Sequence, residues 1–170
     1  AGTQVFWVFL AALLACIALS LMTDAFASER NLFNVARNFA FVAIIAIGMT
    51  TVIASGGIDL SVGSTLVLSA MVISAMMEGG YPFWLSALAA LSAALLVGLL
   101  NGILIAYAGM PAFVVTLGML SAARSLAMVL SNNKMIYEFG PDQDLLLWIG
   151  GGSTLGLPHP LYVLVILTVV

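Results

Sequence analysis

Residues 55–64 read Ser55-Gly56-Gly57-Ile58-Asp59-Leu60-Ser61-Val62-Gly63-Ser64 and interrupt the apolar sequence between positions 39 and 77. Two consecutive glycines permit backbone angles that other residues avoid. Asp59, the one acidic residue in this interval, and Ser61 can both accept hydrogen bonds from the free N–H groups at a helix start. We therefore predict that one helix ends at the glycines and that another begins near Leu60.

The composition places this interruption in a membrane. The chain is 64% hydrophobic and 6% charged, whereas soluble domains carry about 25% charged residues. Apolar runs of about 20 residues cross a bilayer as helices, and the period-two alternation of membrane strands is not visible. The expected fold is an all-α polytopic membrane helix bundle with a broken helix near 55–64. Irregular backbone at membrane depth needs a protein or water lining, which makes this stretch the leading functional candidate: Gly56, Gly57, Asp59, Ser61, Gly63 and Ser64.

The apolar runs predict a single transmembrane domain over residues 1–170. Spans are expected at about 5–23, 39–54, 60–77, 83–107 and 112–130, with another beginning at 161–170. A polar connector is expected at 24–38 and an extramembrane loop at 131–160, with a short interfacial helix at 142–149 anchored by Trp148. Ten residues cover about half of a bilayer, so we expect the sequence to be a fragment.

The fourth run carries a small residue at every fourth position. On a helix these side chains form one slowly turning ridge, which lets membrane helices approach closely. We interpret this ridge as a helix-packing face, with the lining of a translocation path as the alternative; its members are Ser86, Ala90, Ala94, Gly98 and Gly102.

Two charges are expected at membrane depth, where each costs about 2.5–3.5 kcal/mol on insertion scales. Asp59 is expected to cap a helix, to form a polar wall of a translocation route, or to do both. Arg124 is expected to extend toward the interface or to pair with a carboxylate, Asp59 included, with substrate contact as the alternative. Asn101 is a further candidate polar partner.

Several kinds of chemistry have no sequence signal. The chain lacks a glycine-rich phosphate loop with a lysine, a catalytic Ser/His/Asp set, a Cys/His cluster and a basic patch. We therefore expect no enzyme activity, no bound cofactor or metal, and no nucleic-acid partner. His159, bracketed by two prolines, is predicted to be a surface residue.

The motifs together resemble the membrane permease subunits of bacterial ribose-type sugar ABC importers. The resemblance covers nearly the whole chain and rests on three stretches in order: Gly48-Met49-Thr50-Thr51-Val52-Ile53-Ala54-Ser55-Gly56-Gly57-Ile58-Asp59-Leu60-Ser61-Val62-Gly63-Ser64, then Asn101-Gly102-Ile103-Leu104-Ile105-Ala106 with Met110-Pro111-Ala112-Phe113-Val114-Val115-Thr116-Leu117-Gly118, and Ala122-Ala123-Arg124-Ser125-Leu126-Ala127.

This resemblance implies a subunit that forms the pathway of an ATP-driven monosaccharide importer in the bacterial inner membrane, surrounded by lipid. Its implied partners are a second permease copy in a homodimer, cytoplasmic ATPase subunits that bind the ATP, and a periplasmic sugar-binding protein docking on the 132–160 loop. The family's cytoplasmic coupling segment normally follows the span that begins at 161. The family orientation leaves Arg30, Arg37 and Lys134 outside, although the positive-inside rule favours the reverse.

Two other classes remain open. A secondary, ion-coupled transporter also combines broken helices with an intramembrane acid, and Asp59 would then hold the coupling ion or proton. A membrane scaffold would need only the small-residue ridge. The sequence does not identify the sugar or the side chains that line the path.

Overall fold

The computed structural model of the chain describes residues 2–169, which form an almost entirely helical structure. The only strands in this range are two residues long, and they pair antiparallel with Ser153 opposite Pro158 and Thr154 opposite Leu157. The all-α prediction with an interrupted helix is thereby confirmed. In order, the elements are α1 (Gly2–Met22), α2 (Glu29–Ala54), α3 (Val62–Glu78), α4 (Phe83–Ala106), α5 (Ala112–Leu130), α6 (Gln143–Gly151), β1 (Ser153–Thr154), β2 (Leu157–Pro158) and α7 (His159–Val169).

Four helices are long and apolar enough to cross a membrane: Gln4–Met22, Glu29–Ala54, Phe83–Ala106 and Ala112–Leu130. The third predicted span is occupied by α3, an apolar helix of 17 residues. At 1.5 Å per residue α3 is about 25 Å long, a little less than the hydrocarbon thickness of a bilayer. It begins at Val62, two residues later than the sequence predicts, and ends at Glu78, one residue later.

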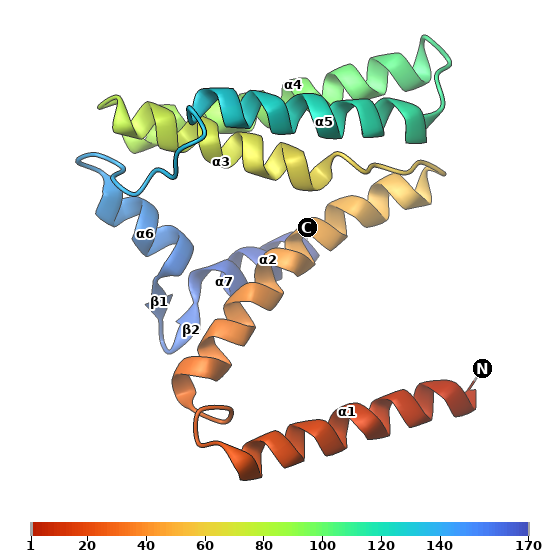
Figure 1. The fold of residues 1–170 in the computed structure, drawn as a ribbon, viewed down its shortest axis with the longest axis vertical. Helices are drawn as coiled ribbons and strands as arrows, with labels where there is room; N and C mark the ends of the chain where they lie inside the picture. Colours follow the sequence, from red (N-terminus) through yellow and green to blue (C-terminus); the bar gives the residue numbers. More distant parts are fainter. Residues whose placement is uncertain (1, 170) are drawn as a thin grey trace.

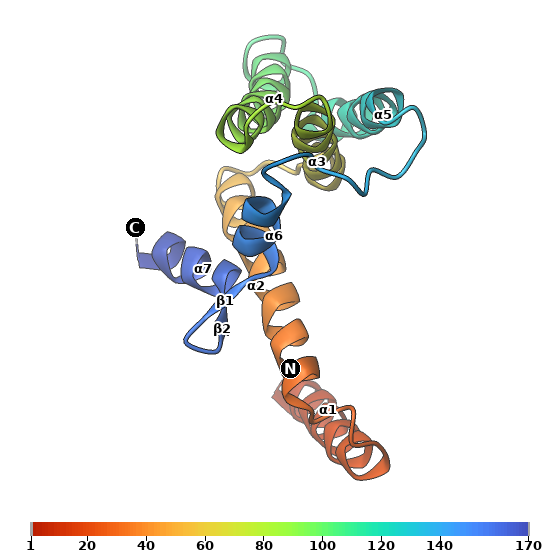
Figure 2. The ribbon, with the colours of Figure 1, turned by 90° about the vertical axis from the view of Figure 1, so that its left-hand side faces the viewer.

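Helices α3, α4 and α5 form a three-helix bundle at one end of the molecule (Figure 1). Figure 2 views these helices close to end-on, with α3 packed against both neighbours. Their shared core contains Leu68, Val97, Ala123 and Ala127. The long helix α2 leads away from this bundle and packs against α7, while α1 lies at the far end with apolar side chains exposed (Figure 1).

Helix α2 begins ten residues before the predicted span at 39, so residues 29–38 of the predicted polar connector are helical. The Ser28 side chain accepts a hydrogen bond from the Asn31 N–H at 3.3 Å, and Glu29 stands in the first turn. An N-cap serine and an acidic first turn both favour a helix start. The polar residues at positions 29–38 therefore belong to a helix that continues into the predicted span, and not to a loop.

The segment between α5 and α6 is connected to the three-helix bundle by a side-chain hydrogen bond. The Asp142 carboxylate accepts a hydrogen bond at 2.8 Å from the backbone N–H of Phe83, the first residue of α4. The cap position of α4 is Pro82, which supplies no side-chain acceptor. Asp142 thus caps α4 from a distant part of the chain. The short helix predicted at 142–149 is observed as α6 at Gln143–Gly151, and Trp148 is exposed.

His159 closes the corner between α6 and α7. Its Nδ1 lies 2.6 Å from the Trp148 carbonyl oxygen and its Nε2 lies 2.8 Å from Thr154 Oγ1. The ring also packs edge-on against the Trp148 indole, with 4.3 Å between centroids. The histidine predicted to be a simple surface residue is therefore half-buried and holds the two-stranded turn in place.

Candidate functional site

Two glycines produce the interruption between α2 and α3, which we call the break (residues 55–61). Gly56 adopts φ +80°, a left-handed conformation that side chains disfavour. Its N–H donates to the Ile53 carbonyl at 2.9 Å, and the Gly57 N–H donates to the Val52 carbonyl at 3.0 Å. A Cβ on Gly57 would lie 3.3 Å from the Val52 carbonyl oxygen. Gly56 therefore supplies the angle and Gly57 the close approach that end α2.

Asp59 organises the break in a way that differs from the predicted cap. Its Oδ1 accepts the Ser61 N–H at 2.7 Å and the Ser61 hydroxyl at 2.6 Å. This is an Asx turn, in which a carboxylate holds the backbone two residues on. Ser61 occupies the N-cap position of α3, yet its side chain makes no capping hydrogen bond within the described chain. The expectation that both side chains cap the next helix is corrected, because the two bind each other.

Asn101 of α4 makes a hydrogen bond to Ser61 and so connects α4 to the Asp59–Ser61 pair. Its Nδ2 lies 3.0 Å from Ser61 Oγ, and both residues are buried, with 5% and 1% of their surfaces exposed. The single Ser61 hydroxyl proton goes to Asp59, so Ser61 Oγ must accept, and Asn101 must present its NH₂ group. Hydrogen bonds therefore run from Asn101 to Ser61 to Asp59. The Asn101 carbonyl oxygen, Oδ1, is buried without a partner in the described structure.

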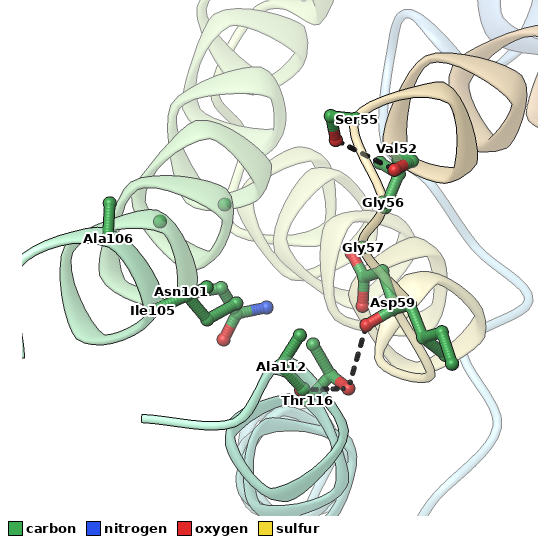
Figure 3. Close-up of a pocket in the computed structure, with 13 residues that line it drawn as sticks. Val52, Ser55, Gly56, Gly57, Asp59, Asn101, Ile105, Ala106, Ala112 and Thr116 are labelled. Atoms are coloured by element: carbon green, nitrogen blue, oxygen red, sulfur yellow. Dashed lines mark hydrogen bonds between the residues drawn. The ribbon is translucent and has the colours of Figure 1, made fainter. Parts of the chain in front are cut away.

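Thr116 of α5 borders the break from the third side, and sequence reasoning missed it. The side chain is 1% exposed; its hydroxyl donates to the Ala112 carbonyl at 2.8 Å and lies 3.4 Å from the Ile58 carbonyl of the break. The available signal was a single hydroxyl in the apolar sequence 112–120. Figure 3 shows the break, α4 and α5 around one space, with the Asn101 amide directed toward it.

Two cavities meet at these residues. The first, of about 450 Å³, lies among the break, the second half of α4 and the start of α5. The second, of about 400 Å³, lies between α3 and α4 and includes Ser61 and Ser69. Asp59, Gly98 and Asn101 line both. No Lys, Arg or His from residues 2–169 lines either cavity.

Arg124 lines neither of these two cavities. It is exposed and lines a separate pocket with Gly63 and Ser64 at the first turn of α3. The structure thus divides the predicted site residues into two groups on different faces of α3. Asp59 takes its hydrogen bonds from Ser61, and the predicted pairing of Asp59 with Arg124 stays a prediction.

The small-residue ridge of α4 changes its surroundings along the helix. Ser86 is fully buried and Ala90 is 7% exposed, so the first part of the ridge packs against neighbours. Ala94 lines the second cavity, Gly98 lines both, and Gly102 lines the first. Apart from the adjoining residues and backbone of α4 itself, no atom of the described residues lies within 4 Å of a Cβ built on either Gly98 or Gly102. The last part of the ridge therefore borders open space.

The part of the chain that contains the break and both cavities is similar to a known protein family. Residues 31–170 match the family described as branched-chain amino acid transport system / permease component. The chain is 41% identical over 125 residues to the galactofuranose transporter permease protein of Escherichia coli (strain K12), covering 74% of this chain and 36% of that protein. It is 36% identical over 157 residues to the ribose import permease protein of the same strain, covering 91% and 49%.

A third relative is the fructose import permease protein of Bifidobacterium longum (strain NCC 2705), 32% identical over 154 residues and covering 90% of this chain and 43% of that protein. The chain spans half or less of the length of these three curated relatives. No solved structure matches it.

Proposed function

The chain belongs to this permease family, and on that premise we propose that it forms part of the transmembrane pathway of an ATP-driven monosaccharide importer. The observation that carries the proposal is its similarity, over 74–91% of its length, to permeases named for galactofuranose, ribose and fructose. The interruption of a membrane helix by a polar, cavity-lining segment supports the same reading, since such backbone is tolerated where it lines a cavity.

The chemistry of the cavities favours a sugar over an amino acid. An amino acid carries a carboxylate, which proteins recognise with arginine, lysine or helix N-termini. The start of α5 borders the first cavity, but neither cavity is lined by a cationic side chain from the described residues, and Asp59 would repel a carboxylate. A neutral solute with several hydroxyl groups has donors to offer to Asp59 and meets no like charge. Among the solutes named by the family and the relatives, the sugars fit this lining.

We propose the remaining parts of the importer from the family resemblance. A second copy of the permease would complete the pathway, and separate cytoplasmic subunits would bind and hydrolyse ATP, because this sequence carries no phosphate-binding loop. A periplasmic binding protein would deliver the sugar. The complex would lie in a bacterial inner membrane, and the chain itself would catalyse no reaction.

Uptake into proteoliposomes tests the proposal. The full-length permease is reconstituted with its ATPase and binding protein, and uptake of labelled pentoses and hexoses is followed with and without ATP. Uptake that requires both ATP and the binding protein is the expected result. Uptake that collapses with an ionophore and needs no ATP would support the alternative, a secondary transporter with Asp59 as its ion site, and Asp59→Asn would then abolish coupling.

A further inference from the structure

We propose that Asp59 and Asn101 form a binding site for a neutral, polyhydroxylated solute where the two cavities meet. This inference rests on the proposed function and adds to it the location of the solute and the groups that hold it. Two hydrogen-bonding positions at this junction have no partner among the described residues, and the adjoining space has room for a small ring.

The first unfilled position belongs to the Asp59 carboxylate. Oδ1 already accepts two hydrogen bonds from Ser61, and Oδ2 accepts none from the described residues. An ionised carboxylate has about four acceptor positions, and an intramembrane charge needs them filled. Since no cation lines either cavity, donors for the remaining positions come from molecules that enter, either water or a solute that displaces it. The hydroxyl groups of a polyol are donors of this kind.

The second unfilled position is the Asn101 carbonyl. Asn101 is 95% buried, and its Oδ1 has no partner among residues 2–169. A buried acceptor without a partner costs about 1–3 kcal/mol. The terminal torsion of asparagine is broad, so a small rotation can turn Oδ1 toward a donor in the adjoining space. Ser69 Oγ, also buried and unpartnered, lines the same second cavity.

The shape of the junction suits a small ring. Gly98 and Gly102 leave open space along one wall, and Gly56 does so along another. The first cavity, about 450 Å³, lies within the roughly 300–1,000 Å³ range of small-molecule sites. Its walls are mostly apolar, with a few polar groups converging on one point, as is usual where a site fixes the orientation of its ligand.

Solute protection of an introduced thiol tests the location. The chain has one cysteine, Cys16 in α1, and the assay uses the complete importer with this and any other cysteine replaced. Gly98→Cys and Gly102→Cys each place a thiol in the cavity wall, and a small charged methanethiosulfonate measures its labelling rate. A sugar at about ten times its Kd leaves about one site in eleven free. Labelling should therefore slow about tenfold at both positions.

A matched control comes from Gly118, an exposed glycine of α5 that lines neither cavity. Apart from the adjoining residues and backbone of α5 itself, no atom of residues 2–169 lies within 4 Å of a Cβ built on it. Labelling of Gly118→Cys should not change with sugar. Added to Gly102→Cys, Asn101→Leu or Asp59→Asn should remove the protection while the complex still copurifies with its ATPase and melts at no lower a temperature than the Gly102→Cys parent. Those results together support the site.

Other results separate the possible failures. If the wild-type importer takes up a sugar with ATP but neither introduced thiol is protected, the site is elsewhere. Protection by sodium ions or by acid, and not by the sugar, would make Asp59 a cation site and overturn the inference. If the wild-type importer takes up no sugar with ATP, the proposed function itself fails, and the uptake measurement alone reveals that.

Discussion

Replacing Asn101 by leucine should make the folded permease more stable, although it removes a buried hydrogen bond. The Asn101 side chain makes one hydrogen bond, to Ser61 Oγ, and leaves its own carbonyl oxygen buried and unpartnered. Losing the hydrogen bond costs about 0.5–1.5 kcal/mol, and removing the unpartnered acceptor recovers about 1–3 kcal/mol. The central values leave Asn101→Leu about 1 kcal/mol more stable. Leucine has the same number of side-chain heavy atoms as asparagine, and the adjoining cavities accept the larger volume of its two methyl groups.

Ser61→Ala provides the matched comparison because it disturbs the same chain of hydrogen bonds in the opposite sense. It leaves the Asn101 NH₂ group unpartnered as well as the carbonyl, and it removes one donor from Asp59. We expect a loss of about 1–3 kcal/mol. In the double variant the leucine removes the amide that Ser61→Ala leaves without a partner. The double variant should therefore be more stable than the sum of the two single changes in unfolding free energy predicts.

Equilibrium unfolding of the purified full-length permease in mixed detergents measures these differences. The expected order of stability is Asn101→Leu, wild type, then Ser61→Ala. A loss above about 1.5 kcal/mol for Asn101→Leu exceeds a whole hydrogen bond. That result would mean that Oδ1 has a partner, such as a bound water, and the argument from an unfilled acceptor would be refuted.

Three further changes probe the surroundings of the site. Asp142→Ala removes the acceptor of the first N–H of α4, so hydrogen exchange in that turn should rise about fivefold for a cost of about 1 kcal/mol. Gly152→Ala would place a Cβ against the Trp148 carbonyl of α6, whereas the control Gly150→Ala enters open space. The protease resistance of residues 143–169 should fall in Gly152→Ala and stay unchanged in Gly150→Ala. Ala90→Val should cost about 1–3 kcal/mol by overpacking, while Gly102→Val, which enters open space, should change stability by less than about 0.5 kcal/mol.

The interruption of the helix could be predicted from sequence, but its hydrogen bonds could not. Paired glycines followed by Asp59 and Ser61 are sufficient to predict that a helix ends. Asp59 and Ser61 are equally good caps in isolation, so sequence alone does not show that they bind each other. That outcome depends on Asn101, forty residues away, which holds the Ser61 hydroxyl in place.

Other differences have the same origin in distant contacts. The capping of α4 by Asp142 and the corner formed by His159 join segments whose sequences carry no mark of each other. The early start of α2 is a different case, because Ser28 and Glu29 were visible as a helix-start signal. There the signal is local, since an N-cap serine followed by an acidic residue favours a helix start.

The position of the cavity follows from two helix lengths. Helix α4 has 24 residues and α3 has 17, and a tight turn aligns the end of α3 with the start of α4. At 1.5 Å per residue, α4 extends about 10 Å beyond the start of α3. Asn101 and Gly102 lie in this extension, where they face the break and the start of α5 across the first cavity. The break shortens α3, and the shortened helix leaves part of the α4 ridge facing open space. Ser86 and Gly102 thus share one sequence pattern but have different surroundings.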